Sequence, residues 1–240
     1  MEDEYCIDNG GRFVAIFDGH GGGGVSTFLR EKLYDKITKH LTAQNGDYES
    51  TNSEVDPTNP AVRSSPVILP SSSPISAVVN SIRAAFTEVG DEVLEMDNFQ
   101  YQGSTALAVW LHEDLQSNRR TLVSANLGDS RAILSRNGQA IDMTRDHKPG
   151  DAFEKKRILS MGETIEWDDY CQIHRVRNLS LSRAIGDRFA KPAISSEVEI
   201  QLIPLSESNS GAGKKDEFIV LASDGLWDVM TSQVRLRFTR

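Results

Sequence analysis

The 240-residue sequence predicts an α+β fold in which mainly antiparallel sheets are covered by helices. Two stretches with helical periodicity, 25–43 and 75–97, precede four short strand-like runs between residues 106 and 143. The Asn137-Gly138 pair between the last two runs is typical of an antiparallel hairpin. Strands that follow one another in hairpins argue against a doubly wound parallel sheet, in which each strand would be followed by a helix.

The first third of the chain contains a strand, a helix and a polar segment. Residues 12–17 form an apolar run that leads into Asp18-Gly19-His20-Gly21-Gly22. Apolar residues then recur at helical spacing over 25–43. Residues 44–74 are rich in Ser, Pro and Asn and cannot bury enough apolar surface to order themselves, so they are predicted to be a flexible insertion.

The remainder is predicted to be strand-rich. After the helix at 75–97, strands are expected at 106–111, 121–126, 131–135 and 139–143. A short helix over 151–161 would be capped by Asp151 and ended by Gly162. Residues 167–176 are expected to be irregular and to project near the site as a flap. A last apolar run, 217–222, leads into Ser223-Asp224-Gly225.

Composition excludes several classes of protein. The net charge of −9, without a Lys/Arg-rich stripe, argues against a nucleic-acid partner. No apolar stretch reaches the ~20 residues that cross a bilayer, and the acidic N-terminus lacks the features of a secretory signal. Cys6 and Cys171 are far apart, which indicates reduced thiols. We therefore expect one soluble domain spanning 1–240, monomeric, in the cytoplasm, the nucleus or both.

Two acidic turns carry the chemical signal. Asp18 and Asp224 each follow an apolar strand and precede a glycine, so rigidly held carboxylates and the Gly19 carbonyl could converge on a divalent metal ion. His20 could protonate the leaving oxygen of a phosphate ester. Taken singly, an Asp-Gly pair is as often a plain turn, and a histidine there could be structural.

Two further acidic turns lie between them. Asp129 follows Asn126-Leu127-Gly128 between two predicted strands, and Asp187 ends the segment Ala184-Ile185-Gly186. Each could be an ordinary turn residue. Four such turns in a strand-rich chain nevertheless favour a metal cluster, because clusters draw carboxylates from separate loops.

An ordered set of motifs resembles the metal-dependent protein serine/threonine phosphatases of type 2C. The matching segments occur in the family's order over nearly the whole chain: Met1-Glu2-Asp3, 17–22, 103–106, 125–132, 144–149, 181–187 and 222–230. The resemblance implies a four-layer α-β-β-α sandwich, with two mainly antiparallel sheets flanked by helices and a metal site at the ends of the sheets.

The resemblance also implies roles for individual residues. Asp18 would bridge two Mn²⁺ or Mg²⁺ ions, the Gly19 carbonyl would bind the first, and Asp224 would bind the second. Glu2 and Asp3 would line the site, Asp129 would join Asp224 at a weaker third ion, and His20 would be the general acid. Phosphoserine and phosphothreonine in phosphorylated protein substrates would be hydrolysed, as part of signalling, by a water activated between the two ions, without a covalent phosphoenzyme.

The sequence departs from the family at both ends, so a truncated chain is expected. The family has a phosphate-gripping arginine three positions before the equivalent of Met1, and a metal-ligand aspartate beyond the equivalent of Gln233; this sequence contains neither. Arg12, Arg131 or Arg183 could replace the arginine. Two other functions stay open, a catalytically impaired phosphatase-like binding or regulatory module and a metal-dependent hydrolase of small phosphate esters.

Overall fold

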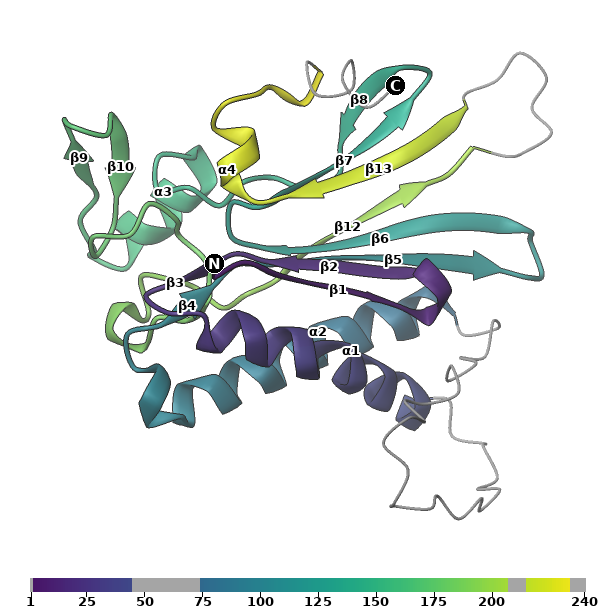
Figure 1. The fold of residues 1–240 in the computed structure, drawn as a ribbon, viewed down its shortest axis with the longest axis horizontal. Coiled ribbons are helices and arrows are strands. Elements are labelled where there is room, and N and C mark those ends of the chain that lie inside the picture. The colour runs from purple at the N-terminus through teal and green to yellow at the C-terminus, as the bar shows by residue number, and fades with distance from the viewer. Residues whose placement is uncertain (1, 45–73, 207–214, 234–240) are drawn as a thin grey trace.

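The structure, a computed structural model, describes residues 2–44, 74–206 and 215–233. Two antiparallel sheets pack face to face, and two long helices cover the outer face of the larger sheet (Figure 1). The predicted α+β class, with antiparallel rather than parallel sheets, is confirmed. The insertion predicted for 44–74 and the divergent segment 234–240 lie almost entirely outside the described residues.

The larger sheet has five strands in the order β1-β2-β5-β6-β12, and every neighbouring pair is antiparallel. Its strands are β1 (Glu4–Asp8), β2 (Phe13–Phe17), β5 (Ala106–Asp114), β6 (Arg119–Leu127) and β12 (Glu199–Pro204). Most of β5 is buried on both faces, as expected of a central strand with a helical layer on one side and a second sheet on the other. The sequence analysis did not predict β1 and β12, which are the two edge strands of this sheet.

Helices α1 (Gly24–Gln44) and α2 (Ile75–Glu95) lie side by side against this sheet (Figure 1). Both predicted helices are confirmed, although α2 ends two residues early because Met96 takes an extended backbone and caps it. Phe13 of β2, Tyr34 of α1 and Trp110 of β5 form an aromatic cluster, with ring centroids 5.1 to 6.1 Å apart. This cluster joins the helical layer to the sheet.

The smaller sheet has the order β13-β7-β8 and covers the inner face of the larger one. It consists of β7 (Arg131–Arg136), β8 (Gln139–Asp142) and β13 (Asp216–Ala222). The hairpin at Asn137-Gly138 is confirmed, and both residues have the positive φ that such a turn requires. On the outer face, Trp227 of the single-turn helix α4 (Asp224–Trp227) packs over Ile133, so the described part of the fourth layer is α4.

Short elements at one end of the sandwich connect distant segments. Strands β3 (Gly19–His20), β4 (Gly103–Ser104) and β11 (Ile185–Gly186) pair in the order β11-β4-β3. Helix α3 (Ala152–Ser160) begins at Asp151, whose carboxylate accepts hydrogen bonds from the Phe153 and Glu154 N–H groups, as predicted. The remaining elements are the 3-10 turns η1 (Asn9–Gly11), η2 (Asp97–Phe99) and η3 (Arg188–Ala190).

The prediction that 167–176 is irregular was wrong. Strands β9 (Glu166–Asp168) and β10 (Ile173–Arg175) form a hairpin that projects from the sandwich at the end where α3 and α4 lie (Figure 1). The Asp168 carboxylate accepts hydrogen bonds from the Tyr170 and Cys171 N–H groups and closes the turn locally. Such a side-chain-closed turn gives no alternating hydrophobic pattern in the sequence.

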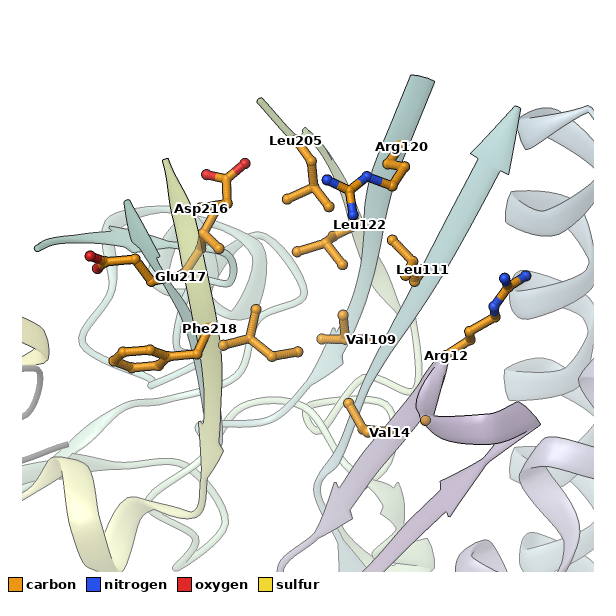
Figure 2. A pocket seen from close by; sticks show the side chains of 13 residues that line it. Arg12, Val14, Val109, Leu111, Arg120, Leu122, Leu205, Asp216, Glu217 and Phe218 are labelled. Carbon is orange, nitrogen blue, oxygen red and sulfur yellow. The ribbon is translucent and has the colours of Figure 1, made fainter. Parts of the chain in front are cut away.

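A cavity of about 270 Å³ lies between the two sheets, against the first residues of β13. Figure 2 shows Val14, Val109, Leu111 and Leu122 on the strands that face β13 across this space. None of its lining residues belongs to the acidic turns. None of the helices in the described ranges has the length and apolar character needed to cross a membrane.

A buried ionic group joins α3 to the segment that leads into β11. Glu154 is 1% exposed, and its carboxylate accepts hydrogen bonds from Arg183, Arg157 and Ser182. Burial opposes ionisation of Glu154, but the hydrogen bonds and charges of the two arginines outweigh it and lower its pKa to about 2. The carboxylate is therefore a structural anion with all of its bonds made inside the protein.

We predict that Glu154→Gln lowers the free energy of unfolding by about 3 kcal/mol, because it leaves buried arginines without their charge partner. The loss should be full above pH 4.5, the ordinary pKa of the group, and should shrink as pH falls toward 2. Urea unfolding at several pH values measures it. Glu163→Gln removes the partner of the half-exposed Arg177 and should cost much less, because solvent screens that pair; equal losses in both variants would contradict the prediction.

Candidate metal and phosphate site

One cavity of about 160 Å³ collects three of the four acidic turns predicted from the sequence, whereas Asp187 does not line it. Asp18 and His20 reach it from the end of β2 and from β3, Asp129 from the turn between β6 and β7, and Asp224 from the start of α4. Loop residues 178–181 and Arg175 of the β9–β10 hairpin complete the lining with Thr105. The antiparallel strands therefore deliver carboxylates from three distant parts of the chain to one place.

Hydrogen bonds hold the Asp18 turn to the neighbouring segment. The Asp18 N–H donates to Thr105 Oγ1 at 3.1 Å, and the Thr105 N–H donates back to the Asp18 carbonyl at 2.9 Å. Thr105 also shares a hydrogen bond with Ser130, which follows Asp129. A side chain at Gly128 would collide with Thr105, so the Asp129 turn can approach this closely only with glycine there.

The gathered carboxylates repel one another. Burial, and then the charges of Asp224, Asp3 and Asp129, raise the pKa of Asp18 to about 7. Burial also raises the pKa of Asp129 to about 6, although the Lys148 ammonium opposes the shift. Asp3 touches the cluster from the N-terminal segment and accepts a hydrogen bond from Ser223. The cluster thus carries more negative charge than its own surroundings balance.

The donor set fits a hard divalent cation. Asp129 is 2% exposed, and its Oδ2 atom has no hydrogen-bond partner, which is costly for a buried carboxylate unless a cation supplies the missing interaction. In the described ranges, however, no three His, Cys, Asp or Glu side chains are already arranged to hold one ion. The carboxylates have suitable chemistry, but their side chains would have to move closer together to hold one ion.

Glu2 takes a different place from the other predicted site residues. Its side chain is exposed and does not line the cavity, whereas its backbone carbonyl accepts a hydrogen bond from Ser26 beside Gly19. The backbone of Glu2 therefore packs against the Gly19 turn: a Cβ built on Gly19 would lie 2.6 Å from the Glu2 carbonyl oxygen.

His20 is held by a buried partner. Its Nε2 lies 2.9 and 2.8 Å from the two carboxylate oxygens of Asp187, which is fully buried. Gly103 lies against this pair, and any side chain there would meet both Asp187 Oδ2 and His20 Nε2. Burial opposes protonation of His20, but the hydrogen bond and charge of Asp187, followed by the charges of Asp18 and Asp129, outweigh it and raise the His20 pKa. The pair therefore favours imidazolium in the cavity.

The three arginines considered as phosphate ligands lie elsewhere. Arg12 pairs with Glu113, Arg131 pairs with Asp146 and stacks over Trp227, and Arg183 pairs with buried Glu154. Instead, Arg175 lines the cavity, and its Nε donates to Asp168 at 2.7 Å. No sequence signal marked Arg175, because it lies in the segment that was expected to be irregular.

Fold and site together define a layered α+β domain with a carboxylate-lined cavity at one end of its two sheets. The chain belongs to the protein phosphatase 2C family, whose sequence profile matches residues 7–240.

Curated relatives agree with this assignment. The chain is 35% identical to "Probable protein phosphatase 2C 75" of Arabidopsis thaliana over 95% of this chain and 50% of that protein. It is 33% identical to "Probable protein phosphatase 2C 8" of Oryza sativa subsp. japonica, with the same coverage of each chain. The chain thus spans about half the length of the curated relatives it matches.

Two solved structures share the fold. A C. elegans sex determining protein aligns with a TM-score of 0.68 at 24% identity, over 94% of this chain and 46% of that one. A serine-threonine phosphatase 2C from Toxoplasma gondii aligns with a TM-score of 0.65 at 22% identity, over 92% of this chain and 70% of that one.

We predict that Asp187→Asn lowers the pKa of His20, because the amide keeps the shape of the carboxylate but loses its charge. Asparagine also tolerates the left-handed backbone of position 187, where φ is 51°. NMR titration of the histidine ring protons in metal-free protein gives the value. Asp169→Asn on the exposed hairpin turn is the control, and a His20 pKa that is unchanged in Asp187→Asn would refute the assignment.

Proposed function

We propose that this protein is a metal-dependent phosphatase that hydrolyses phosphoserine and phosphothreonine in proteins. The observation that supports this most is the single cavity in which Asp18, Asp129 and Asp224 face His20 and Arg175, in a chain of the 2C family. Anionic groups for cations, a proton donor and a fixed guanidinium are the groups that phosphate ester hydrolysis requires.

Asp18, Asp224 and the Gly19 carbonyl would hold two Mn²⁺ or Mg²⁺ ions, with Asp3 and Asp129 at their sides. When bound, such ions make a water acidic enough to lose its proton near neutral pH. The raised pKa of Asp18, which is caused first by burial and then by the neighbouring carboxylates, supports this assignment, because a nearby cation would stabilise the ionised form against both. A weaker third ion at Asp129 and Asp224 is part of the proposal.

His20 would complete the reaction on the leaving-group side. As water oxygen bonds to phosphorus and the phosphorus–oxygen bond to serine or threonine breaks, the leaving oxygen needs a proton. Imidazolium on His20 can donate it, and Asp187 orients the ring and stabilises its charged form. Cys6 and Cys171 lie outside the cavity lining, so no cysteine nucleophile is invoked.

Arg175 would bind the substrate phosphate. A guanidinium can donate two parallel hydrogen bonds to phosphate oxygens, and Arg175 is positioned on the hairpin by Asp168 and by the Asn178 carbonyl. This assignment replaces the three arginines suggested by the sequence. The exposed hairpin tip, where Tyr170 is 96% exposed, would then meet the phosphoprotein itself.

We also propose a monomer in the cytoplasm or nucleus. Both cysteines are free thiols, in keeping with a reducing compartment, and the acidic net charge offers no surface for nucleic acid.

The main test is release of phosphate from a phosphothreonine peptide in the presence of Mn²⁺. We expect turnover that EDTA abolishes and that Asp18→Asn lowers by about a thousandfold, because the ions lose their shared ligand. Small sugar phosphates, assayed in parallel, should be poorer substrates. Metal-independent turnover would refute the proposal, whereas tight phosphopeptide binding without turnover would identify a binding module.

Arg175→Ala should raise KM for the phosphopeptide and lower kcat/KM by about a hundredfold, the cost of losing a charge-assisted phosphate contact. Arg177→Ala is a matched control, since Arg177 pairs with Glu163 outside the cavity lining. Steady-state kinetics with both variants decide the question. Similar effects of the two substitutions would assign Arg175 to the stability of the hairpin and not to substrate binding.

A further inference from the structure

The ammonium of Lys148 lies beside the carboxylate cluster, between two aspartates. Its Nζ atom is 3.2 Å from Asp228 Oδ1, to which it donates a hydrogen bond, and 3.7 Å from Asp129 Oδ2. The longer distance is beyond hydrogen-bond reach, which is why Asp129 Oδ2 has no hydrogen-bond partner despite the nearby charge. Lys148 thus balances charge at Asp129 without satisfying its lone pairs.

The backbone next to Lys148 is firmly held. The preceding residue, His147, donates its N–H to the Gly128 carbonyl at 3.0 Å and accepts the Gly128 N–H on its ring. Asp146, one residue earlier, makes two hydrogen bonds to Arg131. The loop that carries Lys148 is therefore fixed to the turn that carries Asp129, so the ammonium cannot drift away from the site by backbone motion.

The side chain of Lys148 can nevertheless leave. It is 36% exposed, and Asp228 is 61% exposed, so the ammonium can rotate into solvent on its flexible stem. A divalent ion that binds Asp129 would come within a few ångströms of this ammonium, where two positive charges repel strongly in a partly buried setting. Only one of the two cations can lie against Asp129 at a time.

We propose that Lys148 is an internal competing cation that sets the affinity of the Asp129 side of the cavity for a divalent ion. This inference rests on the proposed function, since it assumes that the carboxylate cavity binds metal. With the ammonium in place, the buried charge of Asp129 is partly balanced when no ion is bound. An ion that enters must displace the ammonium, which weakens this position relative to that at Asp18.

The test is Mn²⁺ titration of the full chain by calorimetry and by electron paramagnetic resonance of free Mn²⁺. Lys148→Met keeps the aliphatic stem and removes the charge, and it should tighten the weakest Mn²⁺ binding step by about tenfold or more. Lys148→Arg retains the charge and should leave that step within about twofold of the wild type. Lys155→Met, on the exposed face of α3, is the control for loss of a lysine.

Two results would overturn the inference. If Lys148→Met binds Mn²⁺ with unchanged or lower affinity at every step, Lys148 only supports the conformation of Asp129 or of the α4 segment; thermal unfolding of each variant would show that the protein still folds. If the wild-type chain binds no Mn²⁺, both this inference and the metal centre of the proposed function fail. The first of these two results would refute the inference about Lys148 alone and would leave the proposed metal centre standing.

Discussion

Repulsion among the carboxylates at one end of the sandwich is the constraint on which the rest of the structure depends. Asp18, Asp129 and Asp224 line one cavity, and burial together with mutual repulsion raises the pKa of Asp18 to about 7. Such an arrangement destabilises a fold unless other parts hold it in place. Here the packing of the two sheets fixes the strand ends, so the backbone cannot move the aspartates apart.

The small sheet β11-β4-β3 positions residues of the candidate site at one end of the sandwich. Its three strands are two residues each, too short to add much stability, yet they place Gly19-His20, Gly103 and Gly186 in register. His20 and Asp187 are 167 residues apart in sequence and meet because His20 lies in β3 and Asp187 directly follows β11. Gly103 between them leaves room for the contact. The geometry of the His20–Asp187 pair is thus a result of strand pairing and not of local loop structure.

The sequence predicted the long helices, the central strands and the turn aspartates, because each depends on local periodicity or on a Gly-containing turn. It could not predict the edge strands β1 and β12, whose pairing is decided by distant neighbours. The place of Arg175 in the cavity lining was hidden for a different reason, since the β9–β10 turn is closed by the Asp168 side chain and leaves no hydrophobic pattern. Arg131 and Arg183 were plausible phosphate ligands until their partners, Asp146 and Glu154, were known.

The cationic groups around the cavity share one property that explains how the cluster can remain available to metal ions. Each has an anionic partner outside the group formed by Asp18, Asp129 and Asp224: His20 has Asp187, Arg175 has Asp168, and Lys148 has Asp228. If these cations bonded the cluster directly, its oxygens would be satisfied and a divalent ion would gain little by binding. Because their hydrogen bonds go to other carboxylates, His20 and Arg175 line the cavity without hydrogen bonds to the cluster, and Lys148 lies 3.7 Å from Asp129, whose Oδ2 keeps no hydrogen-bond partner.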